Sequence, residues 1–414
     1  MKRVVITGMG AVTPIGNSVS AMWSAMRAGV CGIGPIIKFD TADYKVKIAA
    51  ELKDFDPSLV MEKSEVRKTD PFTRYALAAA AEAMAQSGLT VADPYRFGVY
   101  VGSGIGGMDT LLREHEALRV KGPRFVSPHF IPMMISNIAA GNVAIRYGAM
   151  GPCLPVVTAC ATSTHAIGEA YRAIKLGIAD AILAGGTEAT INTLAVAGFT
   201  NCMALTARND PQSASIPFDR RRDGFVMGEG AGIMVLEEYS HAKARGARIL
   251  GEITGYANLC DAYHVTAPQP EALPAARAIC MAMEEAGITP DQAGDLYINA
   301  HGTSTPLNDK TETLAIKRAL GDAAYQAAIS STKSMTGHML GAAGGVEAIA
   351  AAMALRDGVL PPTIGYGEPD PECDLDYVPN QARQAQKGYA LSLSLGFGGH
   401  NAVLALKRFE EADQ

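Results

Sequence analysis

Apolar and polar positions along the chain follow two alternating periods. Short apolar runs predict buried strands at 4–7, 97–101, 181–184, 232–238, 249–256, 296–299 and 391–395, and another strand starting at Ile329. Apolar residues at helical spacing predict helices at 19–28, 71–87 and 341–355, and one from the region of Cys160 to Gly177. Strands that alternate with helices in this way indicate an α/β fold.

Local signals fix some of these ends. Asp70 followed by Pro71 is typical of a helix start, since Asp caps free N–H groups and Pro suits the first turn. Gly88 is expected to end that helix. The first strand is expected to enter a turn at Gly8–Gly10.

The segment 155–165 predicts a strand, a tight elbow and a helix, with Cys160 at the elbow. A thiol at a helix N-terminus lies beside the positive end of the helix dipole, which favours the thiolate. We therefore take Cys160 as the candidate nucleophile. The alternative for an arbitrary cysteine is a small buried side chain that fills a gap.

The order of elements occurs twice. A strand that runs into a Gly-containing loop, at 97–107, has a counterpart at 296–303. The elbow and helix at 156–176 have a counterpart at 329–355. This pattern predicts two related α/β halves, at 1–250 and 251–414, whose loops meet at one site because ligands gather at strand C-terminal ends.

Four candidate reactive residues follow strand ends in these two halves: Cys160, His301, Lys333 and His338. A thiolate forms acyl intermediates, and two imidazole N–H groups can stabilise an enolate, so the set suggests acyl transfer followed by carbon–carbon bond formation. Glu312 and Glu347 are candidate partners for Lys333. The N–H groups of Phe397 and Cys160 could form an oxyanion hole, although a plain turn between two strands is the alternative for the Phe397 loop.

Composition narrows the class of protein. The chain has 414 residues, is 48% hydrophobic and has a net charge of −6, which argues against non-specific nucleic-acid binding. Its seven cysteines include no CxxC pair, so no disulfide framework or zinc site is predicted. No stretch is long and apolar enough to span a bilayer, and we expect a cytoplasmic protein. The glycines at 102–107 do not predict a dinucleotide site, because Lys121 and Gly122 stand where an acidic residue is needed.

Several motifs together resemble the β-ketoacyl-acyl carrier protein synthases, specifically the type II elongating enzymes of bacterial fatty-acid synthesis. They are VITGMGAVTPIG, GSGIGG, TACATSTHAIG, GGTEA, PFDRRRDGFVMGEGAG, NAHGTSTPLND, STKSMTGHMLGAAGG and GFGGHN, which together cover essentially the whole chain. The resemblance implies a thiolase-like fold with two duplicated halves in a five-layer αβαβα arrangement, and a homodimer.

The resemblance also implies a reaction. Cys160 takes an acyl chain from acyl carrier protein, and His301 with His338 supports decarboxylation of malonyl-acyl carrier protein. The products are 3-oxoacyl-acyl carrier protein and CO2, with phosphopantetheine carried by the substrates and no resident cofactor. A monovalent cation near Asn299 and Glu347 is a further implication.

Individual positions match family roles in the same way. Phe397 matches a gatekeeper, Ile105 an acyl-pocket gate, and Thr266 and Thr303 the pantetheine channel. Further substrate-binding positions are Phe130, Phe199 and Gly398. The basic cluster Lys63, Arg67 and Lys68 matches a docking site for the acidic carrier, although a solvated surface is the alternative for such a cluster.

Two positions depart from many relatives: His400 stands where Thr is common, and Met203 stands where some relatives have a basic docking residue.

A type II polyketide ketosynthase is the main alternative function. A thiolase is disfavoured because the Phe397 loop has no second cysteine, and His338 argues against an initiating synthase of the Cys-His-Asn type. Cys160 argues against a non-catalytic chain-length subunit, and the two histidines argue against a pure carrier-binding module.

Overall fold

The central sheet consists of two similar halves of four strands and one further strand at its edge. The computed structural model describes residues 1–410, and nine of its strands form one sheet. In spatial order they are β4 (Phe97–Gly102), β5 (Ala181–Glu188), β6 (Gly230–Glu238), β1 (Val4–Val12), β7 (Gly251–Cys260), β13 (His400–Lys407), β12 (Tyr389–Gly396), β8 (Leu296–Asn299) and β9 (Ala328–Ser330).

Pairing directions repeat with this order. β4 is parallel to β5, while β5–β6 and β6–β1 are antiparallel. In the other half β8 is parallel to β12, while β12–β13 and β13–β7 are antiparallel. The predicted internal repeat is therefore present in the sheet. The predicted division after residue 250 stays a prediction, and the last four residues of its second half lie outside the described part of the chain.

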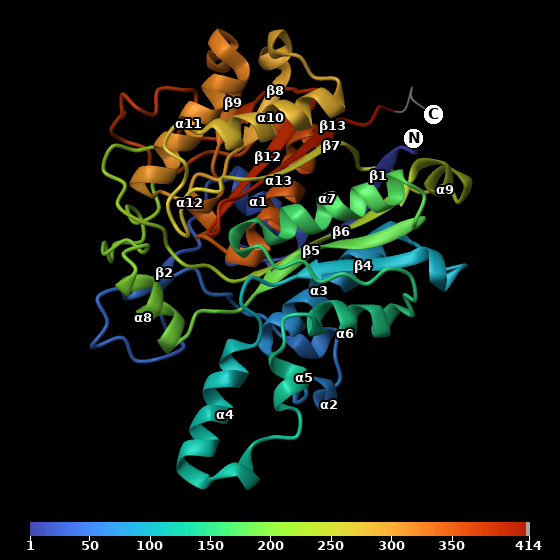
Figure 1. The fold of residues 1–414 in the computed structure, drawn as a ribbon, viewed down its shortest axis with the longest axis vertical. Helices are drawn as coiled ribbons and strands as arrows, with labels where there is room; N and C mark the ends of the chain where they lie inside the picture. The colour runs from blue at the N-terminus through green and yellow to red at the C-terminus, as the bar shows by residue number, and fades with distance from the viewer. Residues whose placement is uncertain (411–414) are drawn as a thin grey trace.

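Helices form three layers around the two halves of the sheet. The outer layers hold α3 (Pro71–Ser87) with α6 (Ile138–Tyr147), and α10 (Leu273–Ala286) with α11 (Pro306–Leu320). The central layer holds α7 (Thr162–Lys175) and α13 (Ala343–Asp357), and α13 contacts both β6 and β12. Figure 1 shows these layers from α10 and α11 at the top to α3 and α6 below. The expected five-layer thiolase-like arrangement is confirmed.

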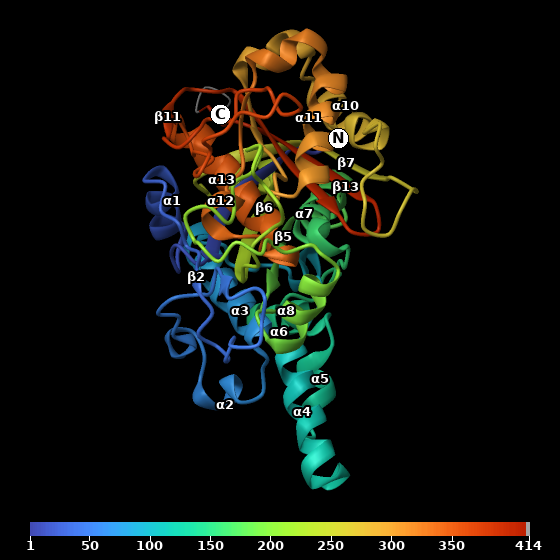
Figure 2. The ribbon, with the colours of Figure 1, turned by 90° about the vertical axis from the view of Figure 1, so that its left-hand side faces the viewer.

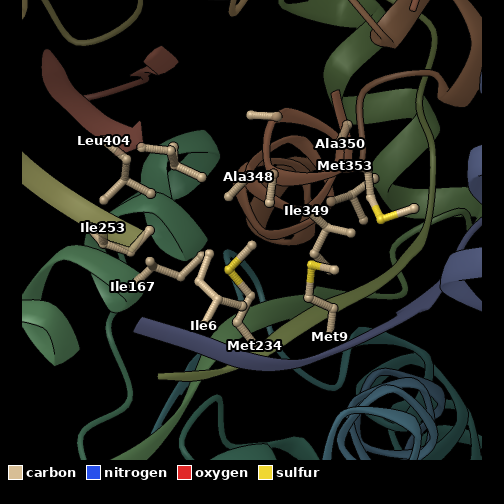
Figure 3. Packing of buried hydrophobic residues seen from close by; sticks show 14 of the residues in the cluster. Ile6, Met9, Ile167, Met234, Ile253, Ala348, Ile349, Ala350, Met353 and Leu404 are labelled. Atoms are coloured by element: carbon tan, nitrogen blue, oxygen red, sulfur yellow. The ribbon is translucent and has the colours of Figure 1, made fainter. Parts of the chain in front are cut away.

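Burial of apolar residues between these layers holds the halves together. The largest core cluster joins side chains from β1, β6, β7, β13, α7 and α13. Figure 3 shows Ile6, Ile167 and Ile253 of this cluster close together, and Ile349 pointing toward Met9 beside them. Two further clusters lie under α3 and under α10 with α11.

Smaller elements surround this core. The remaining α-helices are α1 (Val19–Arg27), α2 (Lys63–Val66), α4 (Met108–Lys121), α5 (Phe130–Met134), α8 (Thr193–Asn201), α9 (Tyr239–Ala244) and α12 (Lys333–Thr336). Short strands pair as β2 (Gly34–Pro35) with β3 (Ile48–Ala49), and β10 (Val359–Leu360) with β11 (Arg383–Gln384). The 3-10 helices include η4 (Ala159–Ala161) and η7 (Leu340–Ala342), besides 57–59, 94–96, 123–125, 290–295 and 321–326. Helices α4 and α5 project from the body in Figure 1 and Figure 2.

Within residues 1–410, no helix has the length and apolar character needed to cross a membrane.

Both predicted ends of α3 are confirmed by the caps that predicted them. The Asp70 side chain accepts from the N–H of Phe72, and Gly88 ends α3 with φ of 58°. The expected turn at Gly8–Gly10 is wrong, because β1 continues to Val12. Both glycines instead allow α3 to lie against the strand: a Cβ would lie 2.1 Å from the Ala83 carbonyl oxygen at Gly8, and 1.9 Å from that of Ala79 at Gly10.

Candidate active site

Cys160 lies in η4, which leads directly into α7. The residue before it, Ala159, has φ of 50°, a left-handed conformation that is uncommon for a residue with a side chain. The counterpart η7 leads into α13, and Leu340 there has φ of 46°. The two elbows are thus conformationally alike, as the repeat predicts.

The strand expected before the Cys160 elbow is wrong. Residues 155–158 form no regular strand. The segment before them contacts β4 through the bridge between Cys153 and Val99 and through the N–H of Gly151, which donates to the carbonyl oxygen of Phe97. The side chains of Leu154 and Val157 are 45% and 49% exposed. The apolar run therefore lies at an open edge of the sheet, where no second strand pairs with it.

The Cys160 side chain is 9% exposed, and the N–H of Phe397 donates to its sulfur. Burial raises the pKa of the Cys160 thiol to about 11, while the charge of Lys333 lowers it. The expectation that the elbow favours the thiolate is therefore wrong for the free protein: removal from water outweighs the nearby positive charge and the N–H donor. Cys160 is a thiol at neutral pH.

The two predicted histidines face each other near Cys160. His301 follows β8 and His338 follows α12, and their ring centroids lie 5.3 Å apart at 86°. Burial and the charge of Lys333 hold the pKa of each imidazole well below its usual range. Both rings are consequently neutral at physiological pH.

Neighbouring donors select one tautomer for each ring. The ammonium of Lys333 lies 3.4 Å from Nδ1 of His301, and the N–H of Leu340 donates to Nδ1 of His338 over 3.3 Å. A neutral imidazole whose Nδ1 accepts carries its proton on Nε2. Each histidine therefore has an Nε2–H group to offer to a ligand oxygen.

Of the two carboxylates expected to partner Lys333, only Glu347 forms an ion pair with it. Glu312 instead accepts from the N–H groups of His301 and Gly302, at 2.6 and 2.7 Å. Burial raises the pKa of Glu312 to about 7. Its contribution is to hold the backbone that carries His301.

A cavity of about 370 Å³ opens onto these groups. The predicted residues that line it are Cys160, Phe199, Thr266, His301, Thr303, His338 and Phe397. Lys333 is buried behind the histidines, and Gly398, Ile105 and Phe130 are not among the lining residues. Phe130 lies in α5 on the projecting arm, and Ile105 is 41% exposed in the loop after β4.

The residues that sequence reasoning missed include two lining residues beside His338 and one buried carboxylate. Leu340 supplies the N–H that selects the His338 tautomer, and Phe225 packs edge-on against the same ring with centroids 5.1 Å apart. Glu188 lies behind the cavity and bonds to both halves of the protein. The GGTEA motif contains Glu188, but nothing local to it indicates these partners.

The two departures from the family pattern lie at the same cavity. His400 and Met203 both line it, and Met203 is 87% exposed. The basic residues Lys63, Arg67 and Lys68 are all exposed, on α2 and the turn after it. Their side chains are therefore accessible to another protein.

Among the described residues, the buried oxygens without a hydrogen-bond partner include Asn299 Oδ1, Glu347 Oε2 and Ser392 Oγ, besides Thr332 Oγ1, and Glu347 is the ion-pair partner of Lys333. Asn299 and Ser392 are direct neighbours in the pairing of β8 with β12. Unpaired buried acceptors are costly, and a hard cation prefers oxygen ligands. These residues therefore fit the expected monovalent cation, whereas no group of three or more His, Cys, Asp or Glu suited to a metal occurs in residues 1–410.

Comparisons with known proteins agree with this geometry. The family model for the beta-ketoacyl synthase N-terminal domain matches residues 1–242, and that for the C-terminal domain matches residues 250–367. Proteins named 3-oxoacyl-[acyl-carrier-protein] synthase 2 from Synechocystis sp. and Staphylococcus aureus are 51% and 53% identical, each covering 99% of both chains.

Solved structures extend the likeness to the fold. A beta-ketoacyl synthase from Burkholderia phymatum superposes with a TM-score of 0.91 at 36% identity, covering 99% of this chain and 100% of that one. A type II polyketide ketosynthase in complex with its acyl-carrier protein gives 0.90 at 35% identity, with the same coverage. Full-length similarity and the Cys-His-His cavity lead to one conclusion: this chain belongs to the beta-ketoacyl synthase family.

Proposed function

We propose that this protein condenses acyl-acyl carrier protein with malonyl-acyl carrier protein in fatty-acid elongation, giving 3-oxoacyl-acyl carrier protein and CO2. The observation that carries the proposal is one cavity lined by a thiol and two neutral imidazoles. A thiol forms the acyl intermediate, and neutral N–H donors stabilise an enolate without releasing a proton to it.

In the first half-reaction, Cys160 Sγ attacks the thioester carbonyl of the acyl carrier protein. The carbonyl oxygen gains negative charge, which the N–H groups of Cys160 and Phe397 stabilise as an oxyanion hole. The carbon–sulfur bond to the pantetheine breaks, and the departing thiolate takes the proton that Cys160 releases. Lys333 favours this step because its charge lowers the pKa of Cys160.

In the second half-reaction, the malonyl thioester loses CO2 and its electron pair forms an enolate. The Nε2–H groups of His301 and His338 donate to the enolate oxygen, and the enolate carbon then attacks the acyl carbonyl on Cys160. The carbon–sulfur bond to Cys160 breaks, releasing the thiolate that takes up a proton to restore the enzyme.

The substrate-binding residues follow from the cavity. Thr266 and Thr303 are positioned to contact the pantetheine arm, and Phe199 and Phe397 lie on its walls. Ile105 and Phe130 lie outside this cavity, and we assign them to the acyl end of the substrate on the strength of the family resemblance. Gly398 gives the Phe397 loop freedom to move with its φ of 87°. In this proposal no resident cofactor takes part.

Acyl carrier protein is the proposed partner, docked on Lys63, Arg67 and Lys68. A local basic cluster on a chain of net charge −6 steers an acidic protein to one face. The polyketide neighbour, which was solved with its acyl-carrier protein, supports a carrier as partner of this family.

We propose a homodimer as the assembled form. β4 is the last strand at its side of the sheet, and the apolar segment beside it exposes Leu154 and Val157. Ile131 on the projecting arm is 53% exposed. An open apolar edge of this kind is stabilised by a second protein surface.

Seven free cysteines support the cytoplasm as the location of the protein, since thiols persist where the environment is reducing.

A monovalent cation bound by Asn299, Glu347 and Ser392 completes the proposal. It would satisfy the three unpaired oxygens and hold the Glu347 carboxylate against Lys333. Its contribution is electrostatic positioning of that pair.

Mass measurement of the intact protein tests the function. After mixing with long-chain acyl-acyl carrier protein, we expect one acyl adduct per chain, located at Cys160 and absent in Cys160→Ser. An adduct elsewhere, or none, would overturn the proposal.

A polyketide ketosynthase is the second candidate, because a type II polyketide ketosynthase is among the structural neighbours. That neighbour is 35% identical, below the 51% and 53% of the relatives named 3-oxoacyl-[acyl-carrier-protein] synthase 2. Products decide between the two: one condensation per acyl primer supports elongation, whereas repeated condensation without reduction supports the polyketide activity.

A further inference from the structure

A buried carboxylate that takes no part in the proposed reaction joins two loops behind the cavity. Glu188 is fully buried at the end of β5. Its Oε1 accepts from Ser103 Oγ at 2.9 Å, and its Oε2 accepts from the N–H groups of Gly104 and Gly341 at 2.9 and 3.0 Å. The N–H of Ile105 is a further donor. Every partner belongs either to the loop after β4 or to η7.

The approach of these loops to the carboxylate leaves no room for side chains. A Cβ at Gly104 would lie 2.7 Å from Glu188 Oε2, and one at Gly341 would lie 2.8 Å from the same oxygen. The Cβ at Gly104 would also lie 3.4 Å from the carbonyl oxygen of Ala159, the residue before Cys160. The carboxylate therefore sits where both elbows and the Ile105 loop meet.

The internal repeat gives Glu188 a counterpart in the other half. β5 pairs from Ala181 with β4, and β12 pairs from Tyr389 with β8, so the eighth residues of these strands, Glu188 and Gly396, are equivalent. The residue after Gly396 is Phe397, whose N–H donates to the Cys160 thiol. One strand end thus carries the loop with Phe397, and its counterpart carries the Glu188 carboxyl group, which accepts from backbone N–H groups of two other segments.

Both loops held by Glu188 lead to residues of the proposed reaction. Gly104 directly precedes Ile105, the proposed acyl gate. Gly341 directly follows Leu340, whose N–H selects the tautomer of His338. The backbone N–H partners of Glu188 can only donate, and Ser103 Oγ also donates to it here, so both oxygens of the carboxylate accept, whereas an amide at this position offers one acceptor oxygen.

We propose that Glu188 is a positioning residue that holds Ile105 at the acyl gate and the Leu340 N–H against His338. This inference rests on the proposed function, because the gate and the histidine are defined by it. The carboxylate itself touches no substrate.

The experiment compares Glu188→Gln with the wild type in two assays. The first is acylation of Cys160 by acyl-acyl carrier proteins of graded chain length, read by mass. The second is CO2 release from malonyl-acyl carrier protein in a Cys160→Gln background. Because misplacement by about 1 Å can cost about 100-fold, we expect on the order of tenfold less discrimination between chain lengths and on the order of tenfold slower CO2 release.

Glu82→Gln is the matched control. Its carboxylate also accepts two backbone N–H groups, from Ala11 and Val19 at 2.9 and 2.8 Å, but between β1 and α1. We expect it to lower stability without changing chain-length discrimination. The inference is overturned if Glu188→Gln behaves as the wild type in both assays, or if it changes discrimination no more than Glu82→Gln does.

Ser103→Ala is a second variant that tests the inference if Glu188→Gln does not fold. It removes one donor from the gate side only, so we expect altered chain-length discrimination with CO2 release unchanged. Unaltered discrimination in this variant would overturn the inference. Failure of the wild type to form any adduct at Cys160 would instead overturn the proposed function, so the two failures are distinct.

Discussion

Replacing Lys333 by Met removes a buried positive charge with little change in side-chain length. The Lys333 side chain is 1% exposed, lies 3.4 Å from His301 Nδ1 and pairs with Glu347. We expect two separate losses. His301 loses the donor that keeps its proton on Nε2, and Glu347 loses its counter-charge in a buried position.

The size of each loss follows from the contact. A hydrogen bond from a charged group contributes about 1.5–3 kcal/mol. If that preference is reversed by the same amount, so that the proton moves to Nδ1, decarboxylation slows by about 10- to 150-fold, at about 1.4 kcal/mol for each factor of ten. Leaving one member of a buried ion pair alone lowers the free energy of unfolding by about 3–5 kcal/mol.

A double variant separates the two losses. Lys333→Met combined with Glu347→Gln contains no unpaired buried charge, so most of the stability should return while CO2 release stays slow. Stability is measured by urea unfolding, and CO2 release from malonyl-acyl carrier protein is measured in a Cys160→Gln background. CO2 release by the double variant at the rate of its Cys160→Gln parent would refute the role of Lys333 in setting the His301 tautomer.

Three further predictions concern the thiol, the fold and the carrier. Because the pKa of Cys160 is raised to about 11, its alkylation by iodoacetamide should rise about tenfold per pH unit wherever the protein stays folded, and a plateau near the ordinary thiol pKa of about 8.5 would contradict this. Gly10→Ala should lower the free energy of unfolding by about 1–3 kcal/mol, since its Cβ would lie 1.9 Å from the Ala79 oxygen. Gly34→Ala, with nothing within 4 Å, is the control and should unfold like the wild type in urea. Replacing Lys63, Arg67 and Lys68 by Ser should raise KM for acyl carrier protein substrates, most strongly below about 0.1 M salt, and leave kcat with acyl-pantetheine unchanged; an effect independent of salt would count against electrostatic docking.

Much of the fold follows from signals that act within a few residues. Asp70 marks the start of α3 because its side chain accepts from a free N–H group of the first turn. Gly88 marks the end because glycine readily adopts the left-handed conformation that closes a helix. The same local logic failed at Gly8 and Gly10. Those glycines accommodate the carbonyl groups of α3, a helix some seventy residues further along the chain, and read in isolation they indicate a turn.

The elbow at Cys160 shows the same limit. Its apolar run predicts a strand, but a strand forms only where the backbone lies alongside a neighbour closely enough to pair with it. The backbone hydrogen bonds of this segment to β4 end at Leu154, before residues 155–158. The thiol pKa is a second case, because the dipole of the helix is visible in the sequence whereas the degree of burial is not.

The sequence by itself determined the fold class, the internal repeat and the choice of Cys160, His301 and His338 as candidate reactive residues, since strand ends and motifs are local patterns. Tertiary structure decided which carboxylate pairs with Lys333, which imidazole nitrogen carries the proton, and what Glu188 holds. These outcomes depend on groups from distant segments: the Glu188 partners Gly104 and Gly341 are 84 and 153 residues away in the chain. Hydrogen bonds and desolvation act over a few ångströms of space, and only the folded chain sets those distances.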